Sequence, residues 1–463
     1  MVRPIPQFDR LLAGLHVPRG LLMQAGWTTF GYGTTQIIRF ASTVILTRLL
    51  APELFGISVL LVSLRIGMEL FSDLGIGTSV VASQRTRDPV LYRTAWTMQF
   101  LRGVLLAVLA LALLPLFGSI YDDPALRDVL PTLALFLLIA GAHSIAPAIA
   151  TKELRTKRIA AYEIGSALAQ AALTIAAVLV SPTIWGLIIG QLLGALVQAA
   201  ASYLILPDVR CRPLLDRAAF RELFSFGKWI FLSSIVFFLS TYMDRLMLGK
   251  LDALAMLGIY GVARALGDAV AQFGSRMANT IVFPKVAAAD VRGEALRARV
   301  TKRRAQFVLL MLAALALLIA FAEPIIRILY DARYWSAAPV LPWIALATWL
   351  AILNSMADSF ALGVAKPQLS MIGHLAKLAA LVALLPLGIE SAGIVGAAAA
   401  AVAAEMVRYA ALNIALARER LVFVGQDALA TALLIGSGLA LYALASAVVP
   451  ALFTLPPFAI YPA

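Results

Sequence analysis

The stretch Leu64-Arg65-Ile66-Gly67-Met68-Glu69-Leu70-Phe71-Ser72-Asp73 places charged residues inside an apolar run that is long enough to cross a bilayer. Arg65, Glu69 and Asp73 are spaced i, i+4 and i+8, so on a helix they form one charged stripe. A similar pair with i, i+4 spacing, Arg264 and Asp268, lies in another apolar run about 200 residues later. Charges at membrane depth are costly and usually face a bundle interior or a water-filled cavity. We therefore interpret the two stripes as candidate functional sites held by the rest of the chain.

The whole chain is strongly apolar. Of its 463 residues, 62% are hydrophobic and 14% are charged, whereas about 25% of a soluble domain is charged. The apolar residues form long runs rather than short alternating segments, which predicts an all-α integral membrane protein and not a β-barrel. The single cysteine, Cys211, excludes an intramolecular disulfide and a cysteine-based metal cluster. Residues 1–10 lack a signal-peptide pattern, so the first apolar helix is expected to be retained.

Hydrophobic runs predict twelve membrane spans and one further apolar segment. The predicted spans are 21–47, 55–82, 94–118, 128–150, 160–180, 183–206, 224–249, 254–284, 305–322, 336–363, 368–389 and 392–417, and the further segment is 428–449. The last stretch, 450–463, is short and contains four prolines, so we do not expect it to span the membrane.

The basic residues fit this topology. With the N-terminus in the cytoplasm, most lysines and arginines of the connections fall on the inner side, as the positive-inside rule requires. The net charge of +13 is therefore interpreted as a sign of topology, and no nucleic-acid partner is expected. One inner connection, Lys285 to Arg304, ends in Lys302-Arg303-Arg304 and is predicted to form a short amphipathic helix on the membrane surface.

The two halves of the chain look duplicated. Aligning Gly56 with Gly258 also aligns Arg48 with Lys250 and Trp27 with Trp229. Six spans per half give both halves the same orientation, as in transporters whose lobes are related by an axis along the membrane normal. The sequence therefore predicts two six-helix lobes in a parallel pseudo-repeat around a central cavity, followed by one or more extra C-terminal hydrophobic segments. The expected organisation is a cytoplasmic N-terminal segment 1–20, an N-lobe 21–206, a linker 207–223, a C-lobe 224–417 and a C-terminal segment 418–463.

Charged residues within the predicted spans give the candidate site. All but one of the intramembrane basic residues are arginines, and a guanidinium can bind phosphate with two hydrogen bonds, which favours an anionic substrate. The alternative is that the charges are structural ion pairs between helices. The candidate substrate-binding residues are Arg39, Arg65, Gln191, Arg245, Arg264 and Arg276. The candidate ion-coupling or charge-tuning residues are Glu69, Asp73, Asp244 and Asp268.

We expect Arg65 and Arg264 to face one central cavity from opposite lobes, with Glu69 and Asp268 tuning their charge. Arg102 lies near a predicted cytoplasmic end and could extend to the membrane surface instead, as could Arg39 and Arg408 if the span boundaries shift. Gln191 could line the cavity or simply bond a neighbouring helix. His374 could relay protons, although a hydrogen-bonded contact between helices is the favoured interpretation.

Enzyme motifs are missing from the sequence. It contains neither the phosphate-binding pattern G-x-x-x-x-G-K-[ST] nor a histidine–glutamate metal motif, so neither ATP hydrolysis nor a metal site is expected. A membrane-embedded glycan polymerase or ligase is disfavoured, because the predicted outer loops are too short to form a catalytic domain. We predict a protein that is not an enzyme.

Two segments resemble a known family. Leu50-Ala51-Pro52-Glu53-Leu54-Phe55-Gly56, followed by Asp73-Leu74-Gly75-Ile76-Gly77, is similar to the first-to-second-helix signature of the polysaccharide-transport branch of the multidrug/oligosaccharidyl-lipid/polysaccharide flippase superfamily. Asp244-Arg245-Leu246-Met247-Leu248-Gly249-Lys250 and Leu257-Gly258-Ile259-Tyr260-Gly261 resemble its seventh-to-eighth-helix segment.

The resemblance implies a V-shaped, two-lobe flippase of the bacterial inner membrane. Its substrate would be an undecaprenyl-diphosphate-linked oligosaccharide, moved from the inner to the outer leaflet by alternating access. No cofactor is implied, and coupling to H⁺ or Na⁺ is common in the superfamily. The polysaccharide polymerase and chain-length regulator are candidate partners beside membrane lipids. The alternative within the superfamily is a cation-coupled drug or small-solute antiporter that uses Glu69, Asp73 or Asp268.

Overall fold

The computed structural model describes residues 19–72, 75–83, 85, 88–209, 211–250, 254–278, 293–364, 366 and 368–458, and all regular structure among them is helical. The helices of the first half are α2 (Arg19–Leu49), α3 (Pro52–Leu70), α4 (Ile76–Ala82), α5 (Pro89–Ala112), α6 (Leu114–Ile120), α7 (Pro124–Val129), α8 (Thr132–Gly141), α9 (Ala146–Lys152), α10 (Thr156–Val180) and α11 (Ile184–Leu204). Those of the second half are α12 (Arg217–Lys250), α13 (Leu254–Met277), α15 (Gly293–Ala320), α16 (Ala322–Leu329), η2 (Ala332–Ala337), α17 (Leu341–Gly363), α18 (Gln368–Ala417), α19 (Val424–Val448) and η3 (Pro450–Leu452).

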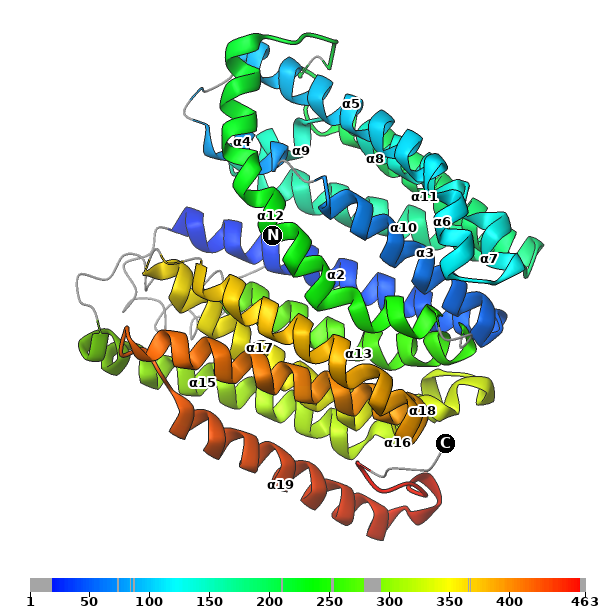
Figure 1. Cartoon of the computed structure of the whole chain (residues 1–463), viewed down its shortest axis with the longest axis vertical. Helices are drawn as coiled ribbons and strands as arrows, with labels where there is room; N and C mark the ends of the chain where they lie inside the picture. Colours follow the sequence, from blue (N-terminus) through cyan, green and yellow to red (C-terminus); the bar gives the residue numbers. More distant parts are fainter. Residues whose placement is uncertain are drawn as a thin grey trace.

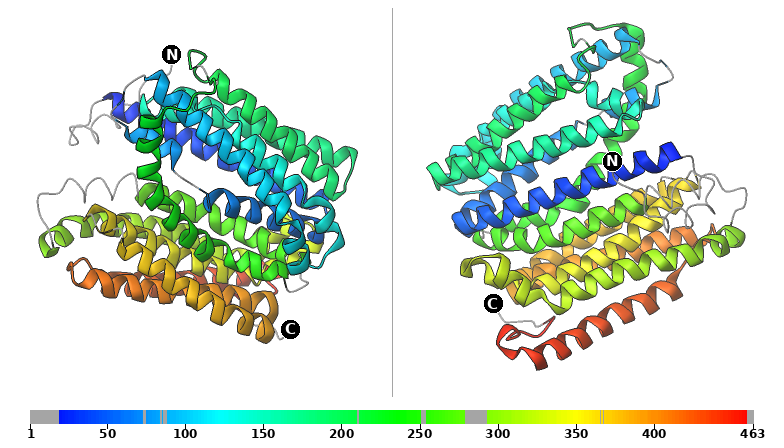
Figure 2. Two further views of the ribbon diagram at one scale, coloured as in Figure 1. Left: turned by 45° about the horizontal axis from the view of Figure 1, so that its top comes forward. Right: turned by 180° about the vertical axis from the view of Figure 1, so that it is seen from behind.

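Each predicted apolar segment corresponds to helix in the described part of the chain. By length and composition alone, nine helical segments of that part could cross a membrane, with the long α18 counted once. The helices α2, α3 and α12 carry charged residues, among them Arg39, Arg65 and Arg245, and run through the same bundle (Figures 1 and 2). The described part of the last stretch, up to residue 458, contains only the short η3, as the sequence predicts. The protein is therefore a multi-pass helical membrane protein.

Local sequence explains where the structure departs from the predicted spans. The span 55–82 breaks after Leu70 and resumes at Ile76, preceded by Gly75 in the left-handed conformation with φ of +55°. The helix α12 begins at Arg217, inside the predicted linker, because the Asp216 carboxylate accepts from the amides of the first turn. The last two predicted spans are found as two helices that share the label α18, because the chain turns back at Ala392 and Gly393, whose backbone is non-helical.

Two lobes and one peripheral helix make up the molecule (Figure 1). In the N-lobe, α10 packs against α2 and α11, and α5 packs against α8. In the C-lobe, the largely buried α17 packs against α13, α15 and α18. The red helix α19 lies along α15 at the edge of the C-lobe. We call the end where residues 205–216 join the lobes the linker end, and the opposite end, where α2 passes into α3, the far end.

The lobes approach most closely at the far end, through a symmetric contact between α3 and α13. A Cβ atom on Gly56 would lie 1.9 Å from the carbonyl oxygen of Leu254, and one on Gly258 would lie 2.0 Å from that of Pro52. Gly56 corresponds to Gly258 in the predicted repeat, and the same alignment matches Pro52 with Leu254. The contact is therefore reciprocal, as at a two-fold axis between equal partners. This reciprocity supports the predicted repeat and its register.

A second reciprocal contact closes the far end. Arg48, at the end of α2, donates to the carbonyl oxygens of Ile328 and Leu329, the last two residues of α16, at 2.8 and 3.2 Å. In return, Arg333 donates to the carbonyl oxygen of Arg48, and the Tyr334 hydroxyl donates to that of Leu50, both at 3.1 Å. Each helix end thus has its terminal carbonyl groups satisfied by side chains of the other lobe. We call this set of contacts the far-end latch.

The helix α12 bridges the two lobes. Its first turns belong to the N-lobe, because Ala219 and Leu223 are buried in one cluster with Val80 and Leu91. Its middle packs against α3 and α18. The preceding segment is bound to α5 through Thr94 and Thr97, whose hydroxyls accept from linker amides. Residues 211–223 therefore move with the N-lobe rather than forming a loose connection.

One charge was assigned wrongly from the sequence. The sequence places Arg304 with the basic residues of an inner connection, but Arg304 is buried in α15, which begins at Gly293. Its guanidinium lies 2.6 Å from the Asp427 carboxylate of α19, and the Tyr409 hydroxyl donates to the same carboxylate. The predicted surface helix is therefore wrong for residues 293–304, which are the first turns of α15; residues 279–292 lie outside the described residues.

Candidate functional site

The N-lobe contributes an accessible ion pair on α3. Nε of Arg65 lies 3.6 Å from Oε1 of Glu69, and each side chain is one third exposed. The Arg65 guanidinium also lies over the ring of Phe136 in α8, 5.3 Å from its centroid. Arg102 donates to the Ser72 hydroxyl and to the Glu69 carbonyl oxygen, so it caps the end of α3. Asp73 lies outside the described residues.

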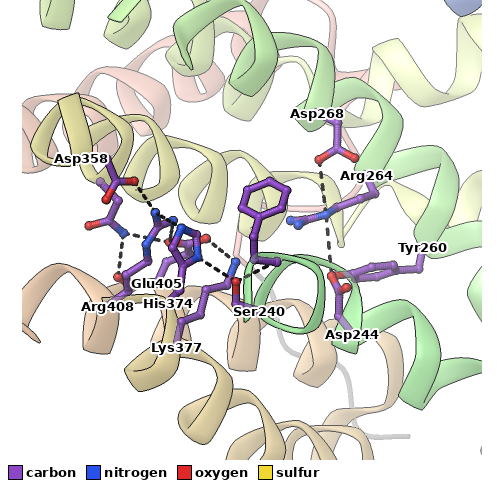
Figure 3. A network of polar contacts seen from close by, with 12 residues as sticks. Ser240, Asp244, Tyr260, Arg264, Asp268, Asp358, His374, Lys377, Glu405 and Arg408 are labelled. Carbon is purple, nitrogen blue, oxygen red and sulfur yellow. Dashed lines mark hydrogen bonds and ion pairs between the residues drawn. The ribbon is translucent and has the colours of Figure 1, made fainter. Parts of the chain in front are cut away.

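The C-lobe carries a tighter cluster on α12 and α13, which we call the α13 cluster: Asp244, Arg245, Tyr260, Arg264 and Asp268. Figure 3 shows its members other than Arg245. Nε of Arg264 lies 3.7 Å from Asp244 and 3.5 Å from Asp268. Arg245 pairs with Asp268, and the Tyr260 hydroxyl donates to Asp244 at 2.7 Å. Two arginines thus face two aspartates, and the cluster has no net charge.

A second cluster lies beside the first, on α12, α17 and both halves of α18. We call it the α18 cluster: Ser240, Asn354, Asp358, His374, Lys377, Glu405 and Arg408. Glu405 accepts from Lys377 at 2.7 Å and lies 3.7 Å from Arg408, which donates to Asp358 at 2.6 Å. Lys377, Glu405 and Arg408 are buried. Arg408 therefore does not extend to the surface, and the α18 cluster is again neutral.

The sequence carries signals for the α18 cluster, although the members of this cluster are not among the candidate site residues. Glu405 and Arg408 are spaced i, i+3, and His374 precedes Lys377 by one turn, so each pair shares a helix face. That the two pairs meet depends on the turn of the chain at Gly393, which no spacing reveals. His374 makes the hydrogen-bonded contact between helices that the sequence favours, with Ser240 of α12.

A polar face joins the lobes between α2 and α13. Gln272 of α13 accepts from the Tyr32 hydroxyl at 3.1 Å and from the Gln36 amide at 3.3 Å. The guanidinium of Arg276, one turn further on, lies 4.4 Å from the Tyr32 ring centroid. Arg39 is exposed on the same face of α2, seven residues after Tyr32. We call these residues, with Asp268, the polar seam.

An apolar groove lies on the other side of the contact between the lobes. It has a volume of about 750 Å³ and is lined by α3, α5, α6 and α12, together with Leu215. Leu215 and Phe220 lie toward its linker end, and Ile120 and Tyr121 toward its far end, so the groove follows the length of the helices. Apart from Tyr121, the polar residues that line it are Ser72 and Arg102.

The structure separates the candidate residues into different settings. Gln191 donates to the Ser58 hydroxyl at 3.1 Å and so connects α11 with α3 inside the N-lobe. Arg65 and Arg264 share one property: Nε of each is buried and has no hydrogen-bond acceptor among the described residues. Both arginines could therefore still donate to an anion. That they face one cavity from opposite lobes stays a prediction.

No group of His, Cys, Asp or Glu suited to a metal ion occurs in the part of the chain that the structure describes.

Comparison with known proteins adds the family. Residues 45–339 match the sequence profile of a family described as polysaccharide biosynthesis protein. The chain belongs to this family. Over 360 residues it is 23% identical to the lipopolysaccharide biosynthesis protein WzxC of Escherichia coli, covering 76% of this chain and 72% of that protein. It is 21% identical over 358 residues to the teichuronic acid biosynthesis protein TuaB of Bacillus subtilis, covering 76% and 73%.

Solved structures confirm the fold. The lipid II flippase MurJ, in an inward closed conformation, superposes with a TM-score of 0.71 at 12% identity, covering 91% of this chain and 98% of that one. An inward-facing multidrug resistance transporter of the same superfamily gives a TM-score of 0.58 at 15% identity, covering 83% and 95%. Together with the family match, they confirm the resemblance to the polysaccharide-transport branch of the superfamily.

Proposed function

We propose that this protein is a flippase, not an enzyme, that moves an undecaprenyl-diphosphate-linked oligosaccharide from the inner to the outer leaflet of the bacterial inner membrane. One observation supports this most: the polar seam and the apolar groove lie on either side of the same contact between the lobes. An amphiphile with a charged, sugar-bearing head and a long hydrocarbon chain needs both surfaces at once. A water-soluble substrate would have no use for the groove.

The residues of the proposed site divide into groups that suit different parts of the substrate. A diphosphate prefers planar, permanently charged guanidinium groups, which Arg39, Arg65 and Arg276 offer in exposed or partly exposed positions. Sugar hydroxyls exchange hydrogen bonds with amides and phenols such as Gln36, Gln272 and Tyr32. The hydrocarbon chain would lie in the groove between α5 and α12. Its burial there is favourable because it removes apolar surface of the chain and of the groove from water.

Alternating access is the mechanism we propose. The far-end latch and the glycine contact hold the lobes together at one end, so the head group would enter at the linker end and leave after the far end opens. In this arrangement the N-terminus, the linker 207–223 and the basic connections are cytoplasmic. The division into an N-lobe 21–206, a C-lobe 224–417 and a C-terminal segment 418–463 is part of the same proposal. A polymerase and a chain-length regulator would act on the product outside.

The names of relatives support a glycan substrate. WzxC and TuaB are named for lipopolysaccharide and teichuronic acid biosynthesis, and a third relative, ExoT of Rhizobium meliloti, is named a succinoglycan biosynthesis transport protein. The drug antiporter of the same fold is the competing hypothesis. A deletion strain that becomes sensitive to drugs while its polysaccharide stays intact would favour that alternative.

Reconstitution in liposomes tests the proposal. The protein is placed in vesicles with a defined lipid-linked oligosaccharide, and the fraction of head groups open to an added glycosidase is followed over time. We expect transfer to fall at least tenfold in Arg65→Ala and Arg276→Gln, which lose a cation of the site. Arg127→Gln is the matched control, because Arg127 is exposed at the far end, paired with Asp122 and distant in sequence from the seam. Equal transfer by all variants would refute the cationic site, and no transfer by the native protein would refute the function.

A further inference from the structure

His374 occupies a position between two helices where a single proton changes the contacts. Its Nδ1 lies 2.8 Å from the hydroxyl of Ser240 on α12, and its Nε2 lies 3.1 Å from Nη2 of Arg408, on the second half of α18 (Figure 3). His374 itself is on the first half of α18, so the imidazole connects three helical segments.

The hydrogen bonds fix the charge state of the ring. Arginine has only donors, so Nε2 of His374 must accept from Arg408 and carries no proton. The Ser240 hydroxyl donates to the carbonyl oxygen of Phe237 at 3.0 Å, so its oxygen is free to accept from Nδ1–H. The imidazole in this structure is therefore neutral, with its proton on Nδ1.

Protonation of Nε2 would break this arrangement. It would place an N–H directly against a guanidinium that can only donate. The charged groups around the ring are Lys377, Glu405 and Arg408 on α18, Asp358 on α17, and Asp244 and Arg245 one turn along α12. With His374 neutral, the charges of the α18 cluster cancel. A proton on the ring adds a positive charge for which this cluster has no partner, so Arg408 and His374 must move apart.

This separation would act on the helix that bridges the lobes. Ser240, the other partner of His374, lies on α12, whose first turns are buried in the N-lobe and whose middle packs on α18. Arg408 and His374 lie on opposite sides of the non-helical pair Ala392–Gly393, where the two halves of α18 can change their angle. Asp244, one turn from Ser240, continues the connection into the α13 cluster.

We propose that His374 is the proton-binding residue that couples transport to a proton gradient, by releasing Arg408 when it is protonated. The proposal rests on the flippase function, and it adds the coupling ion and the residue that binds it. Neutral His374 corresponds to the conformation described here, with the far end closed. Protonated His374 favours a different angle between α12 and α18.

The decisive variant is His374→Gln. A glutamine side chain can still accept from Arg408 but cannot take up a proton, so the contact survives and the titration is lost. In liposomes, we expect the native protein to accelerate transfer at least fivefold when a pH gradient is imposed. The His374→Gln variant should transfer at the same rate with and without the gradient, within twofold of the native rate at zero gradient. A retained response to the gradient, or an equal loss of rate at every pH, would overturn the proposal.

His143→Gln is the matched control, because His143 is also an intramembrane histidine but lies in the N-lobe, after α8. It should keep the full response to the gradient. If His143→Gln loses the response as His374→Gln does, the effect is not specific to the α18 cluster, and the proposal fails.

A second measurement is independent of the substrate. The chain has three histidines, so His16→Gln and His143→Gln together leave His374 as the only imidazole. Nitrogen NMR of this variant in lipid nanodiscs should show the neutral Nδ1–H form at high pH and its conversion to imidazolium as the pH is lowered. A ring that keeps one form throughout overturns the inference even if the flippase assay works. Titration without transport of the lipid-linked sugar would instead refute the proposed function alone.

Discussion

The two lobes carry the same kind of ion pair in opposite settings. Arg65 and Glu69 of the N-lobe are 3.6 Å apart, and each side chain is 33% exposed. Arg264 and Asp268 of the C-lobe are 3.5 Å apart, but the Arg264 side chain is only 12% exposed and also contacts Asp244. Each lobe thus has one i, i+4 pair on its second helix, about one turn apart in the aligned repeat, and the surroundings of the two pairs differ. One lobe leaves its pair partly exposed, and the other encloses its pair in a neutral network.

The difference in burial has an energetic consequence. A partly exposed pair contributes little to stability, about 0–1 kcal/mol, so its residues can be used for binding. Removal of one partner of a buried pair leaves an uncompensated charge, which costs about 3–5 kcal/mol. The C-lobe networks therefore fix the fold locally and respond strongly to any added charge. The following predictions test this contrast.

The largest effect is expected at the centre of the α18 cluster. Glu405→Gln removes the carboxylate shared by Lys377 and Arg408 and should destabilise the protein by about 3–5 kcal/mol. The control Glu69→Gln, in the exposed pair of the N-lobe, should change stability by less than about 1 kcal/mol. Thermal unfolding in detergent, followed by size-exclusion fluorescence, measures both. Similar unfolding midpoints for the two variants would show that the two ion pairs contribute equally to stability despite their different burial.

Arg304 extends the comparison to a buried pair away from the polar seam. Arg304→Met leaves Asp427 buried without its cation and should cost about 3 kcal/mol. The double variant with Asp427→Leu should recover most of that loss, because it leaves no unpaired charge in the contact between α15 and α19. A double variant that unfolds at the same temperature as Arg304→Met would contradict this account of the pair.

The contact between the lobes should respond equally on both sides. Gly56→Ala and Gly258→Ala each place a methyl group against a backbone carbonyl and should cost about 1–3 kcal/mol through overpacking. The added methyl groups should push the lobes apart at the far end. This opening should expose Val59, which lies against Gly261 in the closed form. The labelling rate of a thiol at Val59→Cys, in a Cys211→Ser background, reports this opening.

Gly77→Ala is the control for this test, because the nearest atom to its added methyl group lies 4.0 Å away. It should leave the labelling rate unchanged. Unequal effects of Gly56→Ala and Gly258→Ala would show that the contact is not symmetric in energy.

The smallest effect is expected outside the membrane, at the start of α5. Asp88 accepts from the Val90 amide, so Asp88→Ala should cost about 1 kcal/mol in thermal unfolding. Burial alone would raise the pKa of Asp88, but hydrogen bonds from Val90 and Arg85 lower it overall. The stabilisation is therefore present at neutral pH and is lost as the pH falls below the ordinary aspartate range and through this lowered pKa. Loss of this contribution near neutral pH would contradict the capping role.

The sequence predicts the fold because apolar run length and basic residues are properties of the chain itself. Alignment of the two halves matches Gly56 with Gly258 from the sequence alone. The buried clusters were harder to predict, because Lys377 and Glu405 meet only after α18 turns back at Gly393. Arg304 was placed in a loop for the same reason, since its partner Asp427 comes from a helix far along the chain. Spacing shows which charges share a helix face, and tertiary packing decides which of them are buried.

The reciprocal glycine contact also carries information about the origin of the chain. Two identical molecules that associate around a two-fold axis must use the same patch twice, as Gly56 with Leu254 and Gly258 with Pro52 do here. A short connection from the last helix of one copy to the first helix of the other would give one chain with this contact in its interior. After such a fusion the copies would no longer have to stay alike, so one could keep partly exposed charges while the other enclosed its charges in buried clusters. The symmetry at Gly56 and Gly258 is the arrangement that the fusion of such a homodimer would leave.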